Sequence, residues 1–291
     1  MQNPVHAAEI VRTRRNDARL VHVTLSDKIT PTSSMTDLAG ATAILISVPM
    51  QSLGGLVHDH AGFLDGTALV ACCKGVDLNS LLGPTGLITK ACPNSPCAIL
   101  TGPSFAADIA RGLPTALTFA CQHDRAEALQ HLLSSAALRL YRTDDVIGAE
   151  LGGALKNVIA IAAGIAIGAG LGESARAAVI TRGYAEMVRL AVGLGARAET
   201  LAGLSGFGDL VLTCTSSQSR NFSYGLAIGG QKSFDAKITV EGAATAKAVA
   251  RLAQEKKIDM PIAAVVAALV DQKLTLNAAI RSLLSRPLKE E

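Results

Sequence analysis

Aromatic residues are scarce in this chain, and tryptophan is absent. Only three tyrosines and six phenylalanines occur among 291 residues, although hydrophobic residues make up 49% of the sequence. The interior must therefore be built from alanine, leucine, isoleucine and valine, a mixture typical of packed helices and parallel strands. The chain is long enough for two ordinary domains, each with its own core.

The cysteines form no CxxC pair, and no cluster of metal ligands stands out. The six are Cys72, Cys73, Cys92, Cys97, Cys121 and Cys214. Their spacing argues against a disulfide framework or a zinc ribbon and favours a reduced protein of the cytoplasm. His58, Asp59 and His60 could begin a metal site, but further ligands are missing nearby. We therefore expect no metal and an exposed turn at a helix end.

A strong net charge and long apolar runs are also missing. The net charge is +3, which gives no reason to expect nucleic acid or an anionic membrane as a partner. The uncharged, Ala-rich stretch from Asn157 to Gly172 is shorter than the roughly twenty residues of a membrane span. The N-terminal stretch has arginines but no apolar core, and it includes Glu9 and Asp17. Neither a secretory signal nor a transit peptide is expected.

Two kinds of pattern divide the chain. In residues 1–145 short apolar runs alternate with helical stretches, which predicts a Rossmann-like, doubly wound α/β domain with a mostly parallel sheet. Residues 146–291 show Ala-rich helical periodicity, which predicts an all-α domain. The expected strands are 43–48, 67–71, 98–101, 115–120 and 138–141. The expected helices are 51–59, 105–111, 125–134, 148–167, 175–194, 219–229, 243–255, 263–271 and 276–284.

Three candidate ligand-binding residues follow predicted strands. Open α/β sheets bind ligands beyond the carboxyl ends of their strands, where Lys74, Gly102 and Ser104 lie in this sequence. Gly102 and Ser104 open a helix whose free backbone N–H groups favour an anion or a phosphate. An ordinary helix start and a surface lysine are the alternatives.

Lys156 is the one charged residue in the long, mostly apolar part of a predicted helix, residues 151–167. Because burying an unpaired ammonium is costly, this lysine must reach water, find a carboxylate or lower its pKa. A lysine that is paired with a carboxylate or has a lowered pKa can donate a proton to a carbonyl oxygen. Gly152 and Gly153, one turn earlier, are expected to leave room for a ligand. The alternative is a lysine that snorkels at a helix end.

Two further segments carry candidate groups. Gly203 to Asp209 is expected to be a glycine-rich turn, and Asp209 could pair with Lys156. Arg220, flanked by Ser219 and Asn221 at a helix start, has the fork geometry that grips phosphate. Taken separately, these pieces are a turn, a salt bridge and a helix cap.

Together the segments resemble the bacterial type of NAD(P)-dependent glycerol-3-phosphate dehydrogenases. The matching pieces are KG at Lys74, TGPSFAADIARGLPTA at 101–116, IGAELGGALKNVIAIAAG at 147–164, TRGYAEM at 181–187, GLSGFGDLVLTCTSSQSRN at 203–221 and VEG at 240–242. They follow in the family's order over nearly all of the chain beyond Ala43. The resemblance implies NAD(P)H as cofactor, dihydroxyacetone phosphate and sn-glycerol 3-phosphate as substrates, and a possible homodimer.

The resemblance also implies roles for individual residues. Lys156 acts as proton donor and acceptor at the carbonyl. Lys74, Asn157 and Asp209 orient this lysine and the substrate. The substrate is held by Gly102, Ser104, Ser219, Arg220 and Asn221, with its phosphate near Arg220. The cofactor lies along Lys74, Ala106, Arg220, Thr239 and Glu241.

One departure from the family pattern stands out. The family begins with a strand, a GxGxxG-type turn and a helix, which place the cofactor pyrophosphate on a helix N-terminus. No such segment occurs here, so the chain as written is expected to bind cofactor poorly, through a misassigned start or a truncated gene. Arg12, Arg14, Arg15 and Arg19 could attract a 2′-phosphate, although a solvated helix face is favoured. A β-hydroxyacid or 6-phosphogluconate type dehydrogenase and an inactive remnant that binds only a phosphometabolite are the alternatives.

Overall fold

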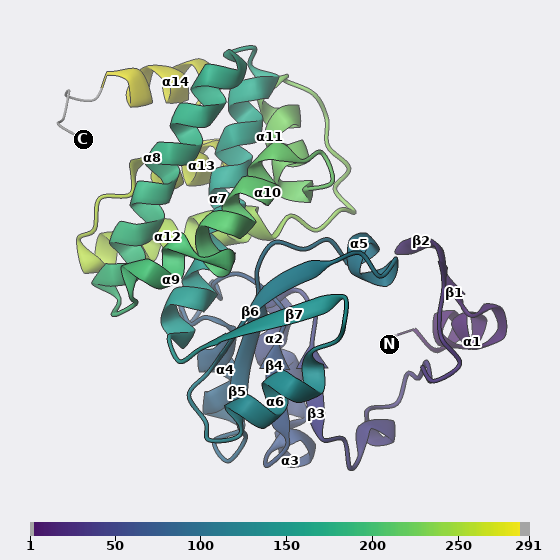
Figure 1. Ribbon diagram of the computed structural model, residues 1–291. Coiled ribbons are helices and arrows are strands. Elements are labelled where there is room, and N and C mark those ends of the chain that lie inside the picture. The colour runs from purple at the N-terminus through teal and green to yellow at the C-terminus, as the bar shows by residue number, and fades with distance from the viewer. Residues whose placement is uncertain (1–2, 286–291) are drawn as a thin grey trace.

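The sheet at the centre of the N-terminal half has five strands. The computed structural model describes residues 3–285 (Figure 1). The strands lie in the order β3 (Ala43–Ile46), β4 (Ala68–Ala71), β5 (Cys97–Thr101), β6 (Thr115–Cys121) and β7 (Leu138–Thr143). All neighbours are parallel except β5 and β6, which are antiparallel. The mostly parallel sheet is confirmed, and its exception follows a connection that holds only the short α5 (Ala106–Ala110).

Apolar side chains are buried on both faces of this sheet. Leu69 of β4 packs with α2 (Met50–Asp59), α3 (Ala61–Leu64) and α4 (Pro84–Ala91), whereas the neighbouring Val70 packs with α6 (Ala126–Leu133). Because successive residues of a strand point to opposite faces, a fully apolar strand fits this double cover. The doubly wound prediction is therefore confirmed.

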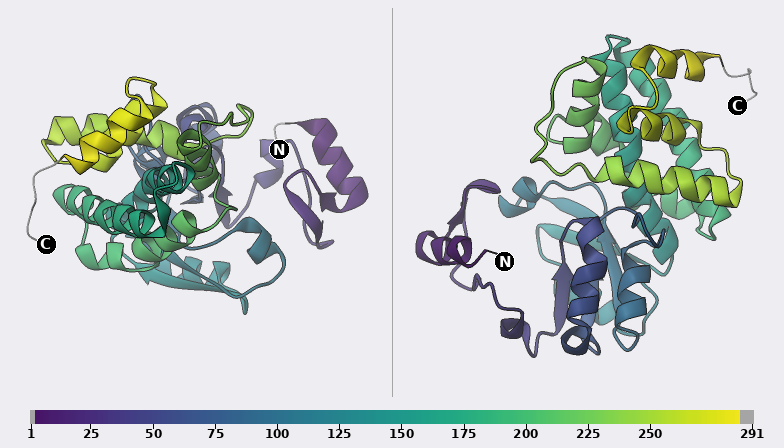
Figure 2. Two further views of the ribbon diagram at one scale, coloured as in Figure 1. Left: turned by 90° about the horizontal axis from the view of Figure 1, so that it is seen from above. Right: turned by 180° about the vertical axis from the view of Figure 1, so that it is seen from behind.

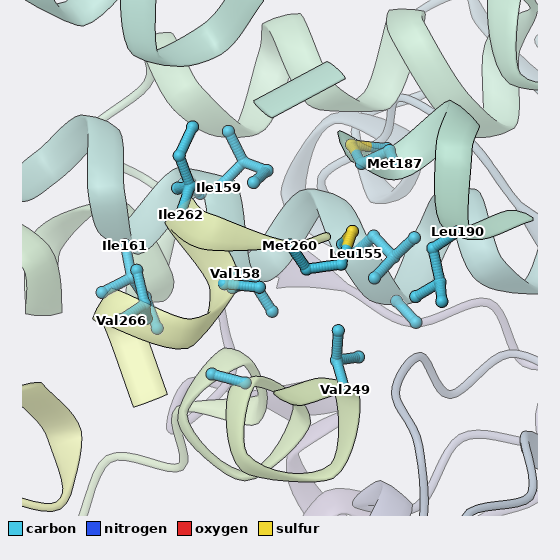
Figure 3. Packing of buried hydrophobic residues seen from close by; sticks show 14 of the residues in the cluster. Leu155, Val158, Ile159, Ile161, Met187, Leu190, Val249, Met260, Ile262 and Val266 are labelled. Carbon is cyan, nitrogen blue, oxygen red and sulfur yellow. The ribbon is translucent and has the colours of Figure 1, made fainter. Parts of the chain in front are cut away.

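The C-terminal half is built around α7 (Val146–Gly168), as Figures 1 and 3 show. Around it lie α8 (Gly172–Gly193), α9 (Ala198–Ala202), α10 (Asp209–Thr215), α11 (Arg220–Gly229), α12 (Glu241–Lys256), α13 (Pro261–Val270) and α14 (Leu276–Leu284). By length and composition α7 could cross a membrane, but 83% of its apolar window is buried inside the protein. It is therefore the core helix of this half, and the predicted helical domain is confirmed. The limits 1–145 and 146–291 stay a prediction.

Glycines let α11 pack directly on the backbone of α7. A Cβ added to Gly164 would lie 2.2 Å from the carbonyl oxygen of Phe222, and one added to Gly225 would lie 2.1 Å from that of Ile161. No side chain fits in such contacts. The backbones meet because both helices present glycine at the crossing, which fixes the N-terminus of α11 relative to α7.

The N-terminal segment stands at the side of the sheet (Figures 1 and 2). It consists of α1 (Pro4–Thr13), the hairpin of β1 (Arg15–Asn16) and β2 (Leu20–Thr24), and a 3-10 turn at Met35–Leu38. The helix expected around Arg12 to Arg19 lies earlier, at Pro4–Thr13, and the hairpin and the 3-10 turn were not expected. Strand β2 contacts α5, and within residues 3–285 no strand pairs with the outer edge of β3. The elements described ahead of β3 therefore do not form a strand–GxGxxG–helix unit.

Candidate active site

A cavity of about 490 Å³ lies where the carboxyl ends of β3 and β4 face the helical half. Nine predicted site residues line it: Lys74, Ser104, Lys156, Asn157, Ser219, Arg220, Asn221, Thr239 and Glu241. Gly102 and Asp209 do not line the cavity, but both accept hydrogen bonds from Lys74, which does. Ala106 is exposed as the first residue of α5 and is not among the lining residues. The structure thus gathers the candidate residues from both halves of the chain in one place.

Two lysines share one buried carboxylate at the floor of this cavity. Asp209 is fully buried, and its Oδ1 accepts a hydrogen bond of 2.6 Å from Nζ of Lys156. Its Oδ2 accepts a hydrogen bond of 2.7 Å from Nζ of Lys74, which also reaches the carbonyl oxygen of Gly102 at 3.3 Å. The cluster therefore sets two basic side chains against one carboxylate, and when both lysines are charged it attracts an anion.

Thr213 completes the surroundings of Lys156, and the sequence analysis missed it. Its hydroxyl accepts a hydrogen bond of 2.7 Å from Nζ of Lys156. Thr213 lies four residues after Asp209 in α10, so both side chains are on the same helix face. This spacing was the available signal, but it required α10 to be recognised as a helix.

The expected glycine-rich turn before Asp209 is helical, which corrects the sequence interpretation. Residues Leu204–Gly208 form one π-helical turn that runs directly into α10. A Cβ on Gly206 would lie 2.0 Å from the carbonyl oxygen of Leu201, so glycine permits the tight packing of this turn. Wide turns of this kind often re-aim a side chain at a functional site.

Gly152 and Gly153 do not leave room for a ligand, contrary to expectation. A Cβ on Gly152 would lie 2.6 Å from the carbonyl oxygen of Ser205. A Cβ on Gly153 would lie 2.5 Å from Oγ1 of Thr101. Protein atoms occupy both positions, so the glycines serve the close packing of α7 on the π-helical turn and on β5.

Burial lowers the pKa of Lys156 to about 7, and the positive charge of Lys74 adds to this effect. The carboxylate of Asp209 opposes the fall but does not cancel it. Near neutral pH the amine is therefore divided between its charged and neutral forms. A group in this state can both donate and accept a proton.

The N-terminus of α11 presents polar groups to the same cavity. Ser219 caps the helix by accepting a hydrogen bond of 3.2 Å from the backbone N–H of Phe222. Asn221 donates to Oδ1 of Asn157 at 3.0 Å and accepts from the backbone N–H of Gly242 at 2.9 Å. These bonds fix both amides, while Arg220 lines the cavity at a helix end that favours anions.

The opposite wall follows β3 and β4 and has a different character. It is formed by Ser47, Val48, Pro49, Cys72 and Cys73. Burial raises the pKa of the Cys73 thiol to about 12 and raises that of Cys72 as well, so neither thiol is a ready nucleophile. This small and mostly apolar surface suits the flat ring of a nicotinamide.

A complete dinucleotide finds less support. Glu241, the first residue of α12, lines the cavity together with Thr239, and burial raises the pKa of its carboxyl group. For a pyrophosphate the described residues offer no glycine-rich helix N-terminus ahead of β3. The residues present therefore fit the nicotinamide half of NAD(P)H.

The four N-terminal arginines do not share a helix face. Only Arg12 belongs to α1, whereas Arg15 lies in β1 beside Asp17. Arg14 donates to the carbonyl oxygens of Ser26 and Ile29. Arg19, in the turn between β1 and β2, lines the cavity. The prediction that these four arginines form one solvated helix face is therefore wrong.

Potential metal ligands do not gather in the part of the chain that the structure covers. No group of three or more histidine, cysteine, aspartate or glutamate side chains there could hold a metal ion. Nδ1 of His58 lies 3.2 Å from the Asp59 carboxylate at the exposed end of α2.

This combination of a doubly wound sheet, a helical second half and a buried lysine between them defines the class of two-domain nicotinamide-dependent dehydrogenases. Family models of the NAD-dependent glycerol-3-phosphate dehydrogenases match the chain, the N-terminal model over residues 1–127 and the C-terminal model over 145–281. The chain belongs to this family.

Individual relatives agree with the family models. A glycerol-3-phosphate dehydrogenase (NAD(P)+) of Cereibacter sphaeroides is 71% identical over 252 residues, which cover 86% of this chain and 83% of the relative. One of Ruegeria sp. is 58% identical and covers 98% of this chain and 90% of the relative. The crystal structure of glycerol-3-phosphate dehydrogenase from Coxiella burnetii superposes with a TM-score of 0.91 at 35% identity, covering 98% of this chain and 90% of that one.

Proposed function

We propose that this protein is an NAD(P)-dependent oxidoreductase that interconverts dihydroxyacetone phosphate and sn-glycerol 3-phosphate, which supplies the glycerol backbone of phospholipids. One observation carries the proposal: the carboxylate of Asp209 joins Lys156 and Lys74 at the floor of a cavity that also holds the N-terminus of α11. The relatives reported above carry the name of this activity.

Lys156 is the proton donor to the carbonyl oxygen during reduction and the acceptor during oxidation. Its lowered pKa keeps both forms populated near pH 7, which suits a reversible reaction. Asp209 and Thr213 accept two of the three ammonium hydrogens and leave the third for the substrate. NAD(P)H, when bound, supplies the hydride.

The phosphate group of the substrate is held at the start of α11. Arg220 offers a planar fork of N–H donors, and the helix N-terminus adds backbone donors and a favourable dipole. Ser219 and Asn221 fix the helix start through their own hydrogen bonds. Ser104, Asn157 and Lys74 line the space between this end and Lys156, and Gly102 fixes Lys74 through its carbonyl oxygen. The cofactor runs along Glu241, Thr239 and α5, where Ala106 lies.

The assay that tests the proposal is oxidation of NADPH and of NADH by dihydroxyacetone phosphate, with the product identified as sn-glycerol 3-phosphate. The matched comparison is reduction of NADP+ by 6-phosphogluconate and by simple β-hydroxyacids. Turnover of these acids alone would favour the related dehydrogenase class. Binding of glycerol 3-phosphate without turnover by either dinucleotide would favour the remnant.

Two further expectations concern the state of the protein. All six cysteines lie within residues 3–285 and are free thiols, which supports a cytoplasmic location. A homodimer is expected from the family resemblance. Sedimentation velocity at micromolar concentration tests it, and a monomer at all concentrations would contradict it.

A further inference from the structure

The hydroxyl group of Thr101 is buried and has no hydrogen-bond partner among residues 3–285. Thr101 is the last residue of β5 and is only 1% exposed, and among the described residues its Oγ1 finds no hydrogen-bond partner. A buried hydroxyl in this state destabilises the fold, and valine has nearly the same shape without that cost. An orphaned polar atom of this kind calls for a role that the free protein does not reveal.

The surroundings of this hydroxyl place it beside one of the two lysines. A Cβ built on Gly153 would lie 2.5 Å from Oγ1 of Thr101 and 3.5 Å from Cδ of Lys74. The hydroxyl and the stem of Lys74 therefore flank the same bare point of α7, three residues before Lys156. Any larger residue at position 153 would separate them.

The two lysines differ in the partners that they use. Nζ of Lys156 donates to Asp209 at 2.6 Å and to the hydroxyl of Thr213 at 2.7 Å. Nζ of Lys74 donates to Asp209 at 2.7 Å, but its second acceptor is the carbonyl oxygen of Gly102 at 3.3 Å. Lys156 thus uses a threonine hydroxyl as its second acceptor, whereas Lys74 uses a long contact to a carbonyl oxygen although the Thr101 hydroxyl flanks its stem.

We propose that Thr101 is a positioning residue that acts through Lys74 when an anionic substrate occupies the cavity. As the ammonium of Lys74 turns toward the phosphorylated substrate, the long contact to Gly102 gives way, and Oγ1 of Thr101 accepts the hydrogen in its place. Gly153 keeps the path between the two side chains open. The inference rests on the proposed function, in which Lys74 orients the substrate.

The test compares Thr101→Val and Thr101→Ser by calorimetry with glycerol 3-phosphate and by thermal unfolding without ligand. We expect Thr101→Val to bind about tenfold more weakly, because a hydrogen bond to a charged group is lost. The same variant should unfold at an equal or higher temperature than the wild type, since an unsatisfied hydroxyl has gone. Thr101→Ser, which keeps the hydroxyl, should bind like the wild type.

Thr118→Val is the matched control. Thr118 is paired with Thr101 across β5 and β6, is 7% exposed, and lines a separate cavity. Its replacement should leave binding unchanged. Wild-type affinity in Thr101→Val would overturn the inference, and so would equal weakening by Thr118→Val or weakening accompanied by a lower unfolding temperature. If the wild type itself does not bind glycerol 3-phosphate, the proposed function fails first, and this inference falls with it.

Discussion

The substrate side and the cofactor side of the cavity are built very differently. On the substrate side the polar groups of α7, α10 and α11 hold one another through short hydrogen bonds, and glycines bring the helices together. On the cofactor side the sheet ends at β3, whose Leu45 is 46% exposed. The N-terminal segment contacts α5 through β2 and packs on the core of the sheet through Met35 and Leu38. Proton transfer and dinucleotide binding therefore depend on separate elements and can be lost separately.

Replacing Lys156 should have the largest effect on the substrate side, because it removes the proposed proton donor. Lys156→Met keeps most of the side-chain length and removes the proton, so kcat in both directions should fall about 10²- to 10⁴-fold. The Kd for glycerol 3-phosphate should change much less, because the phosphate is held elsewhere. Lys90→Met, at the exposed end of α4, is the control. A kcat within tenfold of the wild type would exclude Lys156 as the proton donor.

The cofactor side is tested by comparing the Kd of NADPH with that of reduced nicotinamide mononucleotide, which lacks the adenosine half. If nothing holds the pyrophosphate, the adenosine half adds little, and the two Kd values should agree within about tenfold. A complete site would make two or more charge-assisted hydrogen bonds to that half and would bind NADPH about 100-fold more tightly or better. Calorimetry decides between these outcomes. NADPH that binds about 100-fold more tightly than the mononucleotide would show that residues of this chain, such as Arg19, hold the adenosine half.

One substitution made in each half should have opposite effects on stability. Gly225→Ala places a Cβ 2.1 Å from the carbonyl oxygen of Ile161, which must push α11 from α7 and cost about 3 kcal/mol or more of unfolding free energy. Gly55→Ala in α2 meets no atom within 4 Å, so it should stabilise by about 0.5–1 kcal/mol through higher helix propensity. Urea unfolding measures both. Equal changes of unfolding free energy in the two variants would contradict the difference in packing around Gly225 and Gly55.

The sequence predicted the elements whose pattern is local. The strands β3 to β7 and the helix α7 have continuous apolar runs, and their observed limits lie within a few residues of the predicted ones. Lys156 was recognised because a charge within a long, mostly apolar helical stretch needs an explanation. Asp209 was recognised as its partner for the same reason. These features needed no knowledge of how distant segments meet.

Other features depend on contacts between distant segments. Thr213 and Thr101 look like ordinary residues, and only the crossing of α10 and β5 with α7 brings them to the lysines. The roles of Gly152 and Gly153 were misjudged because what fills the space beside a glycine lies elsewhere in the chain. The strand β6 has the same kind of apolar pattern as the other strands of the sheet, so the pattern alone does not reveal that it runs antiparallel to β5.

Glu186 offers the smallest and most specific test, because it concerns the helical half alone. This carboxyl group of α8 is 3% exposed and accepts hydrogen bonds from the backbone N–H groups of Ile262 and Ala263 at the start of α13. Burial raises its pKa from 4.5 to about 7. Between these values the native state keeps a proton that the unfolded chain has lost, so the free energy of unfolding should fall as pH rises through this range.

The expected fall is at most about 3 kcal/mol between pH 4.5 and 7, since each unit of pKa difference corresponds to about 1.4 kcal/mol. Glu186→Gln removes the titration, so its unfolding free energy should vary less with pH than that of the wild type. The difference between the two proteins isolates this one group from all other titrations. Glu127→Gln, exposed in α6, should keep the wild-type profile. If the profiles of wild type and Glu186→Gln run parallel, the carboxyl group is ionised throughout, and the amides of α13 outweigh its burial.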